Sequence, residues 1–306
     1  MSKKIVFMGT PEFAAPSLES LKNSNHKILT VYTQPARKAN RGQKLVESKI
    51  ETLAKNFSYK LRTPKTLNSQ EEYEFLNSLN PDLVVVVAYG QIIPKKFLNI
   101  PKFGFLNVHA SLLPKWRGAA PIQRSIMNLD NETGISIMKI VEELDAGPVI
   151  LQAKVNINEN IDSLILSKLL SKLGANSLMK AIEKIEKKEV IFYEQNHKEA
   201  TYARKITKNE AEIIWDQNAK EIIAKVNGLN PNPGAWFKYK NERYKVWKAQ
   251  ISNENGLAGS TLDNNLTIAC KDKSIKIIEI QKEGKSRQLI DNFLLGNKIT
   301  KGEKIA

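Results

Sequence analysis

Apolar runs and segments with helical spacing alternate along the first two thirds of the chain. The strongest run, Leu83 to Ala88, is continuous and rich in valine, which is typical of a central strand buried on both faces. Strands are predicted at 5–8, 26–33, 82–88, 104–108, 133–141 and 149–157, and helices at 11–21, 47–57, 69–79 and 162–188. This alternation predicts an α/β domain with a mostly parallel sheet and helices on both faces.

The last hundred residues show a different pattern. A helix predicted at 218–226 stops before Gly228 and Pro231, and short strands separated by polar turns follow it. These strands are expected at 235–239, 244–249, 266–270 and 274–280. Short strands with frequent turns are typical of a small barrel. We therefore predict a Rossmann-like domain over 1–190, a polar and basic linker over 191–208, and an OB-like β-barrel over 209–306.

Composition narrows the class of protein. A chain of 306 residues has room for about two domains, whose cores need neither disulfides nor metal to fold. The single cysteine, Cys270, excludes an intramolecular disulfide and a cysteine-based zinc site. No apolar run is long enough to span a membrane, and the N-terminus lacks a signal-peptide pattern. We expect no membrane association, no bound metal, and a reducing, cytoplasmic location.

The charge points to an anionic partner. The formal net charge is +15, from 47 Lys and Arg against 32 Asp and Glu. Residues 1–204 hold 29 Lys and Arg against 20 Asp and Glu, a net charge of +9. Residues 205–306 hold 18 Lys and Arg against 12 Asp and Glu, a net charge of +6. The loop at 34–44 has four cationic side chains and no acidic one. RNA or DNA is the favoured partner. An ordinary basic protein with a solvated charged loop is the other interpretation, and charge alone leaves both open.

Candidate chemistry begins at the end of the 104–108 strand. Asn107 and His109 are two residues apart, so strand alternation points both side chains the same way. The carboxyl ends of parallel strands face the ligand crevice of an open sheet. There, an amide can stabilise a developing oxyanion and an imidazole can move a proton, which suits acyl transfer. A pair that only satisfies hydrogen bonds of a local turn is the alternative.

Asp145 strengthens the catalytic interpretation. It lies in a tight turn after a predicted strand, two residues before Gly147, which permits a positive φ. A carboxylate beside His109 would hold the tautomer of the imidazole. An aspartate that caps its own turn is the common alternative, and spacing does not show that Asp145 and His109 meet.

These residues lie in stretches that resemble the folate-dependent formyltransferases. Asn107, His109, Asp145 and the Ser-Leu-Leu-Pro segment at 111–114 resemble motifs of that wider group. The continuation Lys-Trp-Arg-Gly-Ala-Ala-Pro at 115–121 narrows the resemblance to the methionyl-tRNA formyltransferases, and the similarity covers nearly the whole chain. The other matching stretches are 7–14, 33–35, 41–45, 88–94 and 144–148.

The resemblance implies formyl transfer from 10-formyltetrahydrofolate to the α-amine of initiator methionyl-tRNA. It implies a monomer that needs no metal, and a catalytic domain followed by a tRNA-binding barrel. The catalytic residues it implies are Asn107, His109 and Asp145, and the folate-binding residues are Ser111, Leu112, Leu113 and Pro114. Candidate tRNA contacts are Arg41, Lys44, Arg117 and Lys205. For Arg117, the alternative is an arginine that pins the tight loop at Gly118.

Two other functions share parts of this pattern. A folate-dependent formyltransferase acting on a small amine, such as a nucleotide sugar, would keep the three catalytic residues but would not need two basic regions. A tRNA-binding protein without activity would be free to lose one of the three. The chain also departs from its relatives at Ile214, where they usually have Asp, and at Asn232, where they often have Trp. Both departures concern only the predicted barrel.

Overall fold

The computed structural model describes residues 2–39 and 44–305. The chain forms two compact units, one of residues 1–118, 133–155 and 167–202, and one of residues 119–132, 156–166 and 203–306. The second unit takes in residues 119–132 and 156–166, which lie inside the predicted 1–190 domain. The domain boundaries expected from the sequence stay a prediction. Within the described residues, no helix is long and apolar enough to cross a membrane.

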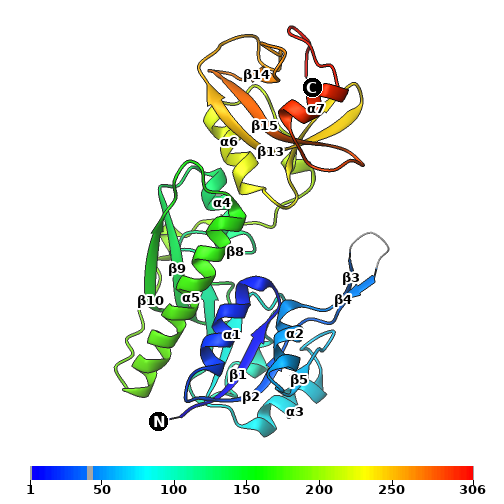
Figure 1. Ribbon diagram of the computed structural model, residues 1–306. Helices are drawn as coiled ribbons and strands as arrows, with labels where there is room; N and C mark the ends of the chain where they lie inside the picture. The colour runs from blue at the N-terminus through cyan, green and yellow to red at the C-terminus, as the bar shows by residue number, and fades with distance from the viewer. Residues whose placement is uncertain (1, 40–43, 306) are drawn as a thin grey trace. The chain divides into compact units, whose positions relative to one another are not determined.

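The first unit is built on a seven-stranded sheet, with the strand order β10-β9-β7-β6-β1-β2-β5 (Figure 1). The strands are β1 (Lys4–Gly9), β2 (Lys27–Tyr32), β5 (Leu61–Arg62), β6 (Leu83–Val87), β7 (Phe105–His109), β9 (Glu132–Lys139) and β10 (Val149–Asn156). The pairs β1–β2, β1–β6, β2–β5 and β6–β7 are parallel, and β7–β9 is antiparallel. The predicted mostly parallel sheet is confirmed, and β6 is buried along its whole length.

Helices cover both faces of this sheet. They are η1 (Glu12–Ala14), α1 (Ala15–Lys22), α2 (Lys49–Asn56), α3 (Gln70–Leu79), η2 (Lys95–Phe97) and the long α5 (Ser163–Glu186). On one face, Leu76 of α3 packs with Val84 and Val86 of β6. On the other, α5 approaches β7 so closely at Gly174 that a Cβ there would lie 2.8 Å from Val108 Cγ1.

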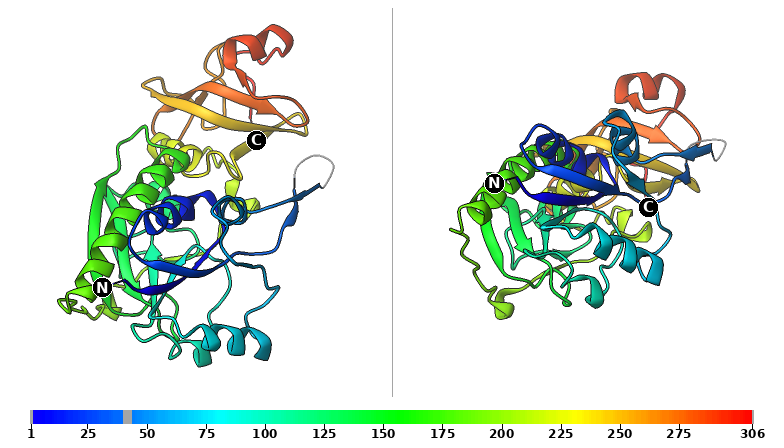
Figure 2. Two further views of the ribbon diagram at one scale, coloured as in Figure 1. Left: turned by 60° about the horizontal axis from the view of Figure 1, so that its bottom comes forward. Right: turned by 90° about the horizontal axis from the view of Figure 1, so that it is seen from below.

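The basic segment that the sequence predicts as a loop contains a short β-ribbon. β3 (Arg37–Ala39) and β4 (Lys44–Val46) pair antiparallel, with Arg37 opposite Val46. The ribbon extends away from the sheet (Figures 1 and 2). Leu45 and Val46 remain exposed, so no buried face left a periodic pattern in the sequence. The ribbon was missed for that reason.

The predicted linker is hydrogen-bonded to the first unit along most of its length. Tyr193 forms a backbone bridge with Val149. After the short η3 (His197–Glu199), the Thr201 amide donates to the Pro114 carbonyl, and the Thr201 carbonyl accepts from the Arg117 amide. β8 (Arg117–Gly118) then pairs with β11 (Tyr202–Ala203). Residues 193–202 are therefore part of the first unit and not a free connector.

The second unit combines helices with an antiparallel sheet. Its helices are α4 (Pro121–Met127), η4 (Asn209–Ala211), α6 (Ala219–Gly228) and α7 (Ile290–Gly296). Its strands are β12 (Ala235–Tyr239), β13 (Glu242–Ser252), β14 (Thr267–Ala269), β15 (Ser274–Lys282) and β16 (Gln288–Leu289). They follow the order β12-β13-β15-β14, with β16 beside β15. Register shifts near Lys248 bend β13 against β15. The structure confirms a separate small β domain in this part of the chain.

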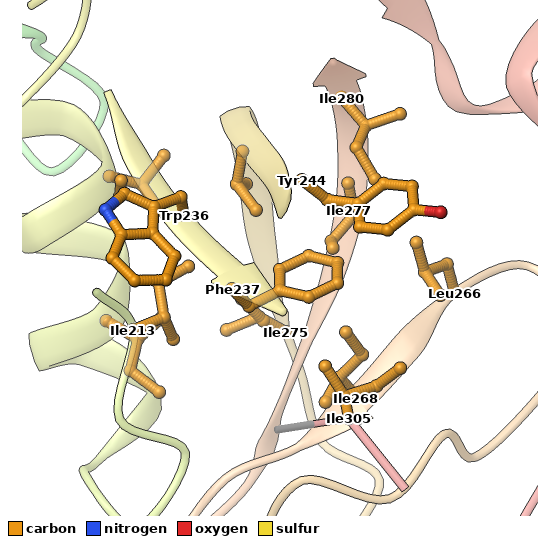
Figure 3. Packing of buried hydrophobic residues seen from close by; sticks show 14 of the residues in the cluster. Ile213, Trp236, Phe237, Tyr244, Leu266, Ile268, Ile275, Ile277, Ile280 and Ile305 are labelled. Atoms are coloured by element: carbon orange, nitrogen blue, oxygen red, sulfur yellow. The ribbon is translucent and has the colours of Figure 1, made fainter. Parts of the chain in front are cut away.

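Isoleucines and aromatic rings fill the core of the second unit (Figure 3). Phe237 of β12 is fully buried there. Its ring centroid lies 5.6 Å from that of Tyr244 and 5.7 Å from that of Trp215. Ile275 and Ile277 of β15 belong to the same cluster. The Phe237 ring is therefore closely packed within the core of the second unit, and this packing contributes to the stability of the unit.

We expect Phe237→Ala to lower the free energy of unfolding by about 3–5 kcal/mol, because it removes a buried ring and leaves a cavity. Urea unfolding followed by tryptophan fluorescence measures this change. Leu257→Ala is the control, since Leu257 is exposed, and it should change stability by no more than about 0.5 kcal/mol. Equal effects of the two substitutions would contradict the packing described for this unit.

Candidate active site

The candidate catalytic residues lie at the carboxyl ends of the sheet strands in the first unit. Asn107 and His109 close β7, and Val108 between them points to the face covered by α5. His109 is buried, with a side chain only 6% exposed. This edge is the position that an open parallel sheet uses for ligands.

The structure brings Asp145 to both of these side chains. Its Oδ2 lies 3.7 Å from His109 Nδ1, and its Oδ1 lies 3.5 Å from Asn107 Nδ2. The amide of Gly118 donates to Asp145 Oδ2 at 2.8 Å. Asp145 itself has a left-handed backbone, with φ +49°. The fold therefore brings Asp145 to the β7 pair, although 36 residues separate His109 and Asp145 in the chain.

The hydrogen bonds of His109 indicate its tautomer. Nε2 lies 2.9 Å from the carbonyl oxygen of Trp116, and a carbonyl can only accept, so Nε2 carries a proton. Nδ1 is the nitrogen that faces Asp145. The ring nitrogen without a proton in this tautomer therefore lies 3.7 Å from the Asp145 carboxylate.

The predicted folate-binding segment, residues 111–114, is held by hydrogen bonds from side chains of β9 and β10. Ser136 Oγ donates to the Ser111 carbonyl at 2.7 Å and accepts from the Leu113 amide at 3.0 Å. Gln152 Nε2 donates to the Leu113 carbonyl at 2.8 Å. Ser111 is fully buried, and its hydroxyl donates to the Lys115 carbonyl. Ser111 and Leu113 thus hold the loop in shape, and Leu112 and Pro114 are half-buried beside them.

Arg117 is not where an RNA contact would be. Its side chain is 0% exposed, and Nε and Nη2 donate to Gln195 Oε1 at 3.1 and 2.8 Å. Nη1 lies 3.4 Å from Glu143 Oε1. A buried guanidinium with these partners is not exposed to a phosphate, so the structure does not support the predicted contact of Arg117 with tRNA. The structure agrees with the alternative interpretation, in which Arg117 fixes the loop before Gly118.

Sequence reasoning missed Gln195, which is buried at the site. Its Nε2 donates to the carbonyl oxygens of Asp145 and Gly147, at 2.9 and 2.7 Å. Gly147 is also tightly packed, because a Cβ there would lie 1.9 Å from the Lys139 carbonyl oxygen. Gln195 belongs to no motif and lies in a polar stretch, so no signal in this single sequence distinguished it.

The other predicted tRNA contacts are spread over the chain. Arg41 lies outside the described residues, and so does the side chain of Lys44, whose backbone begins β4. Lys205 is exposed and belongs to the second unit.

An open cleft of about 370 Å³ lies at the same edge of the sheet as the β7 pair. Gln34 and Pro35 follow β2, and Gly90 and Gln91 follow β6, the strand next to β7. The cleft is lined by Gln34, Pro35, Ala36, Arg37, Lys65, Gly90 and Gln91. Two cationic side chains on its wall suit a ligand with negative charge. Within the described part of the chain, no three His, Cys, Asp or Glu side chains are grouped to hold a metal ion.

Comparison with known families finds a match for two stretches of the chain. Residues 3–182 match the Formyl transferase family, and residues 205–298 match the family described as Formyl transferase, C-terminal domain.

Solved structures share the fold. A six-substitution variant of HypX from Aquifex aeolicus superposes with a TM-score of 0.68 at 17% identity. The match covers 97% of this chain and 49% of that one, so the chain spans about half the length of HypX. A methionyl-tRNA formyltransferase from Clostridium thermocellum has a TM-score of 0.58 at 19% identity, over 84% of this chain and 96% of that one.

Curated proteins of similar sequence share one name. The methionyl-tRNA formyltransferase of Pelagibacter ubique is 54% identical over 100% of this chain and 99% of its own length. That of Nitrobacter winogradskyi is 40% identical over 98% of both chains. Matches at this identity along the whole length show that the chain belongs to the methionyl-tRNA formyltransferase family.

Proposed function

We propose that this chain transfers the formyl group of 10-formyltetrahydrofolate to the α-amino group of initiator methionyl-tRNA, with Asn107, His109 and Asp145 at the reacting atoms. The observation that carries the proposal is the contact of Asp145 with both His109 and Asn107 at the ligand edge of the sheet. Membership of the family supports the choice of donor and acceptor.

The side chains supply what the transfer needs. The acceptor nitrogen attacks the formyl carbon, the bond from that carbon to the folate nitrogen breaks, and one proton passes from the acceptor nitrogen to the folate nitrogen. Asn107 donates a hydrogen bond to the formyl oxygen, which gains negative charge. His109, whose Nε2 proton is donated to the Trp116 carbonyl, holds the proton in transit at Nδ1 beside Asp145. An α-amine with a pKa of about 7.7–8 needs little further activation.

The segment at 111–114 fits a folate donor. Leu112 and Pro114 offer half-buried apolar surface to a flat ring system, and Ser111 and Leu113 keep the backbone of the segment in place. The donor supplies the formyl group and a leaving nitrogen. The chain contributes orientation and hydrogen bonds, and no covalent bond to the enzyme forms.

The acceptor end of the tRNA is held by cationic side chains in this proposal. Arg41 and Lys44, at the basic β3–β4 ribbon, contact phosphates near the reacting amine, and Lys205 contacts a phosphate from the second unit. Arg117 has no direct part. The predicted cytoplasmic location and monomeric state remain predictions.

A formyltransferase acting on a small amine is the competing function. It would share the contact of Asp145 with His109, but basic side chains on both units would then have no ligand. We therefore expect transfer of labelled formyl from 10-formyltetrahydrofolate to methionyl initiator tRNA, and no transfer to free methionine or to an amino sugar nucleotide. Transfer to the small amines without transfer to tRNA would show that the competing function is correct.

Replacement of Asn107 tests the oxyanion role. Asn107→Ala should lower kcat by about 100-fold or more, because a donor to the formyl oxygen is lost. Its KM for tRNA should hardly change. Asn77→Ala is the control, since Asn77 is exposed on α3, and it should keep wild-type turnover. Near-normal turnover of Asn107→Ala would overturn the role proposed for this residue.

Salt dependence tests the role of the cationic side chains. We expect affinity for initiator tRNA to fall steeply as salt rises, because phosphate contacts release counterions. Lys205→Ala should weaken binding and reduce the slope of log affinity against log salt by about one. Lys187→Ala serves as the control, because Lys187 is exposed just after the end of α5. Filter binding at salt concentrations between about 50 and 200 mM measures the slope for each protein. Identical slopes for wild type and Lys205→Ala would contradict a phosphate contact of Lys205.

A further inference from the structure

One amide side chain joins a buried cation to the turn that carries Asp145. Gln195 lies in the stretch predicted as a linker, yet its side chain is buried in the first unit. Its Oε1 accepts both bonds from Arg117, and its Nε2 donates to the carbonyl oxygens of Asp145 and Gly147. The side-chain amide therefore uses its oxygen and both of its N–H bonds within the protein.

The chemistry of these partners leaves one orientation for the amide. A guanidinium only donates, so the oxygen of Gln195 must face Arg117. A backbone carbonyl only accepts, so the NH₂ group must face the turn. Arg117 has no exposed surface and needs acceptors, because an unpaired buried charge is strongly unfavourable. The buried cation thereby fixes the orientation of Gln195.

The turn needs such support. Asp145 has φ +49°, a region that is unfavourable for a residue with a Cβ. The two carbonyls that Gln195 binds lie on either side of Ala146, so one side chain holds both ends of the bend. The position of the Asp145 carboxylate relative to His109 and the Gly118 amide follows from this backbone.

We propose that Gln195 is a positioning residue of the formyl-transfer reaction, which acts by holding the Asp145 turn. This inference rests on the proposed function, because it requires Asp145 to take part in catalysis. Gln195 touches no reacting atom. It works through the backbone on which the Asp145 carboxylate depends, and small displacements of a catalytic group can slow a reaction by up to about 100-fold.

Two variants separate the two sides of the amide. Gln195→Glu keeps acceptors for Arg117 but places a carboxylate against the two carbonyls of the turn, so only the Asp145 side is lost. Gln195→Met removes both sides and serves as a second variant if the first folds poorly. Asn196→Ala is the matched control, because the neighbouring Asn196 amide binds Glu199 and the Lys198 amide instead.

We expect Gln195→Glu and Gln195→Met to lower kcat by about 10-fold or more, with the KM for tRNA and for the folate donor within about twofold of wild type. Thermal unfolding of Gln195→Glu should be less affected than that of Gln195→Met, since only in Gln195→Glu does Arg117 keep its acceptors. Asn196→Ala should leave kcat unchanged. If the two Gln195 variants lose stability but their folded fraction keeps the wild-type kcat, the role of Gln195 is purely structural. That result would overturn the proposal.

A double-mutant cycle with Asp145→Asn gives the decisive readout. If Gln195 acts only through Asp145, then Gln195→Glu should slow the Asp145→Asn enzyme by less than about threefold, because the group it positions is already disabled. The same slowing in both backgrounds would overturn the positioning role.

The cycle also separates this inference from the proposed function. If Asp145→Asn alone keeps wild-type turnover, the catalytic role of Asp145 fails, and the role of Gln195 fails with it. If Asp145→Asn is slow but both Gln195 variants turn over like wild type, only the role of Gln195 is overturned.

Discussion

The hydrogen bond from the Gly118 amide to Asp145 Oδ2 is the contact on which the site depends. It joins two loops that leave different strands and holds the carboxylate 3.7 Å from His109 Nδ1. Together with the contact from Asn107 Nδ2 to Asp145 Oδ1, it fixes the direction of the carboxylate. The sheet positions Asn107 and His109, because β7 ends at His109. The position of the Asp145 carboxylate relative to them is set by these two loops. Site precision therefore comes from backbone amides and carbonyls as much as from the catalytic side chains.

The sequence predicted the parts whose signal is local. The valine-rich run of β6 indicated a buried central strand, and strand alternation placed Asn107 and His109 on one side of β7. Gly147 indicated the tight turn near Asp145, and close approach to the Lys139 carbonyl explains why glycine is required there. Spacing alone did not show that Asp145 reaches His109, because that contact depends on how β9 and the following turn lie beside β7.

The remaining differences have physical causes. Residues 193–202 have the polar composition of a connector, yet the backbone of Thr201 pairs with Pro114 and Arg117, and that of Tyr193 pairs with Val149. Polar composition reflects the side chains and not the backbone hydrogen bonds, so it does not indicate this packing. The resemblance made Arg117 a candidate contact of the tRNA, but Gln195 and Glu143 bind it in a buried position, which a single sequence does not reveal. In the ribbon of β3 and β4, pairing occurs without burial, so it left no apolar period.

The central claim is that Asn107, His109 and Asp145 act as one unit in formyl transfer. The most direct measurement compares single-turnover rates for the three single alanine variants with the rate for the triple variant. Residues that act as a unit are strongly non-additive, so the triple variant should transfer formyl within about tenfold of the slowest single variant. A triple variant slowed by the product of the three single losses would contradict a common unit, and so would single variants that all keep wild-type rates.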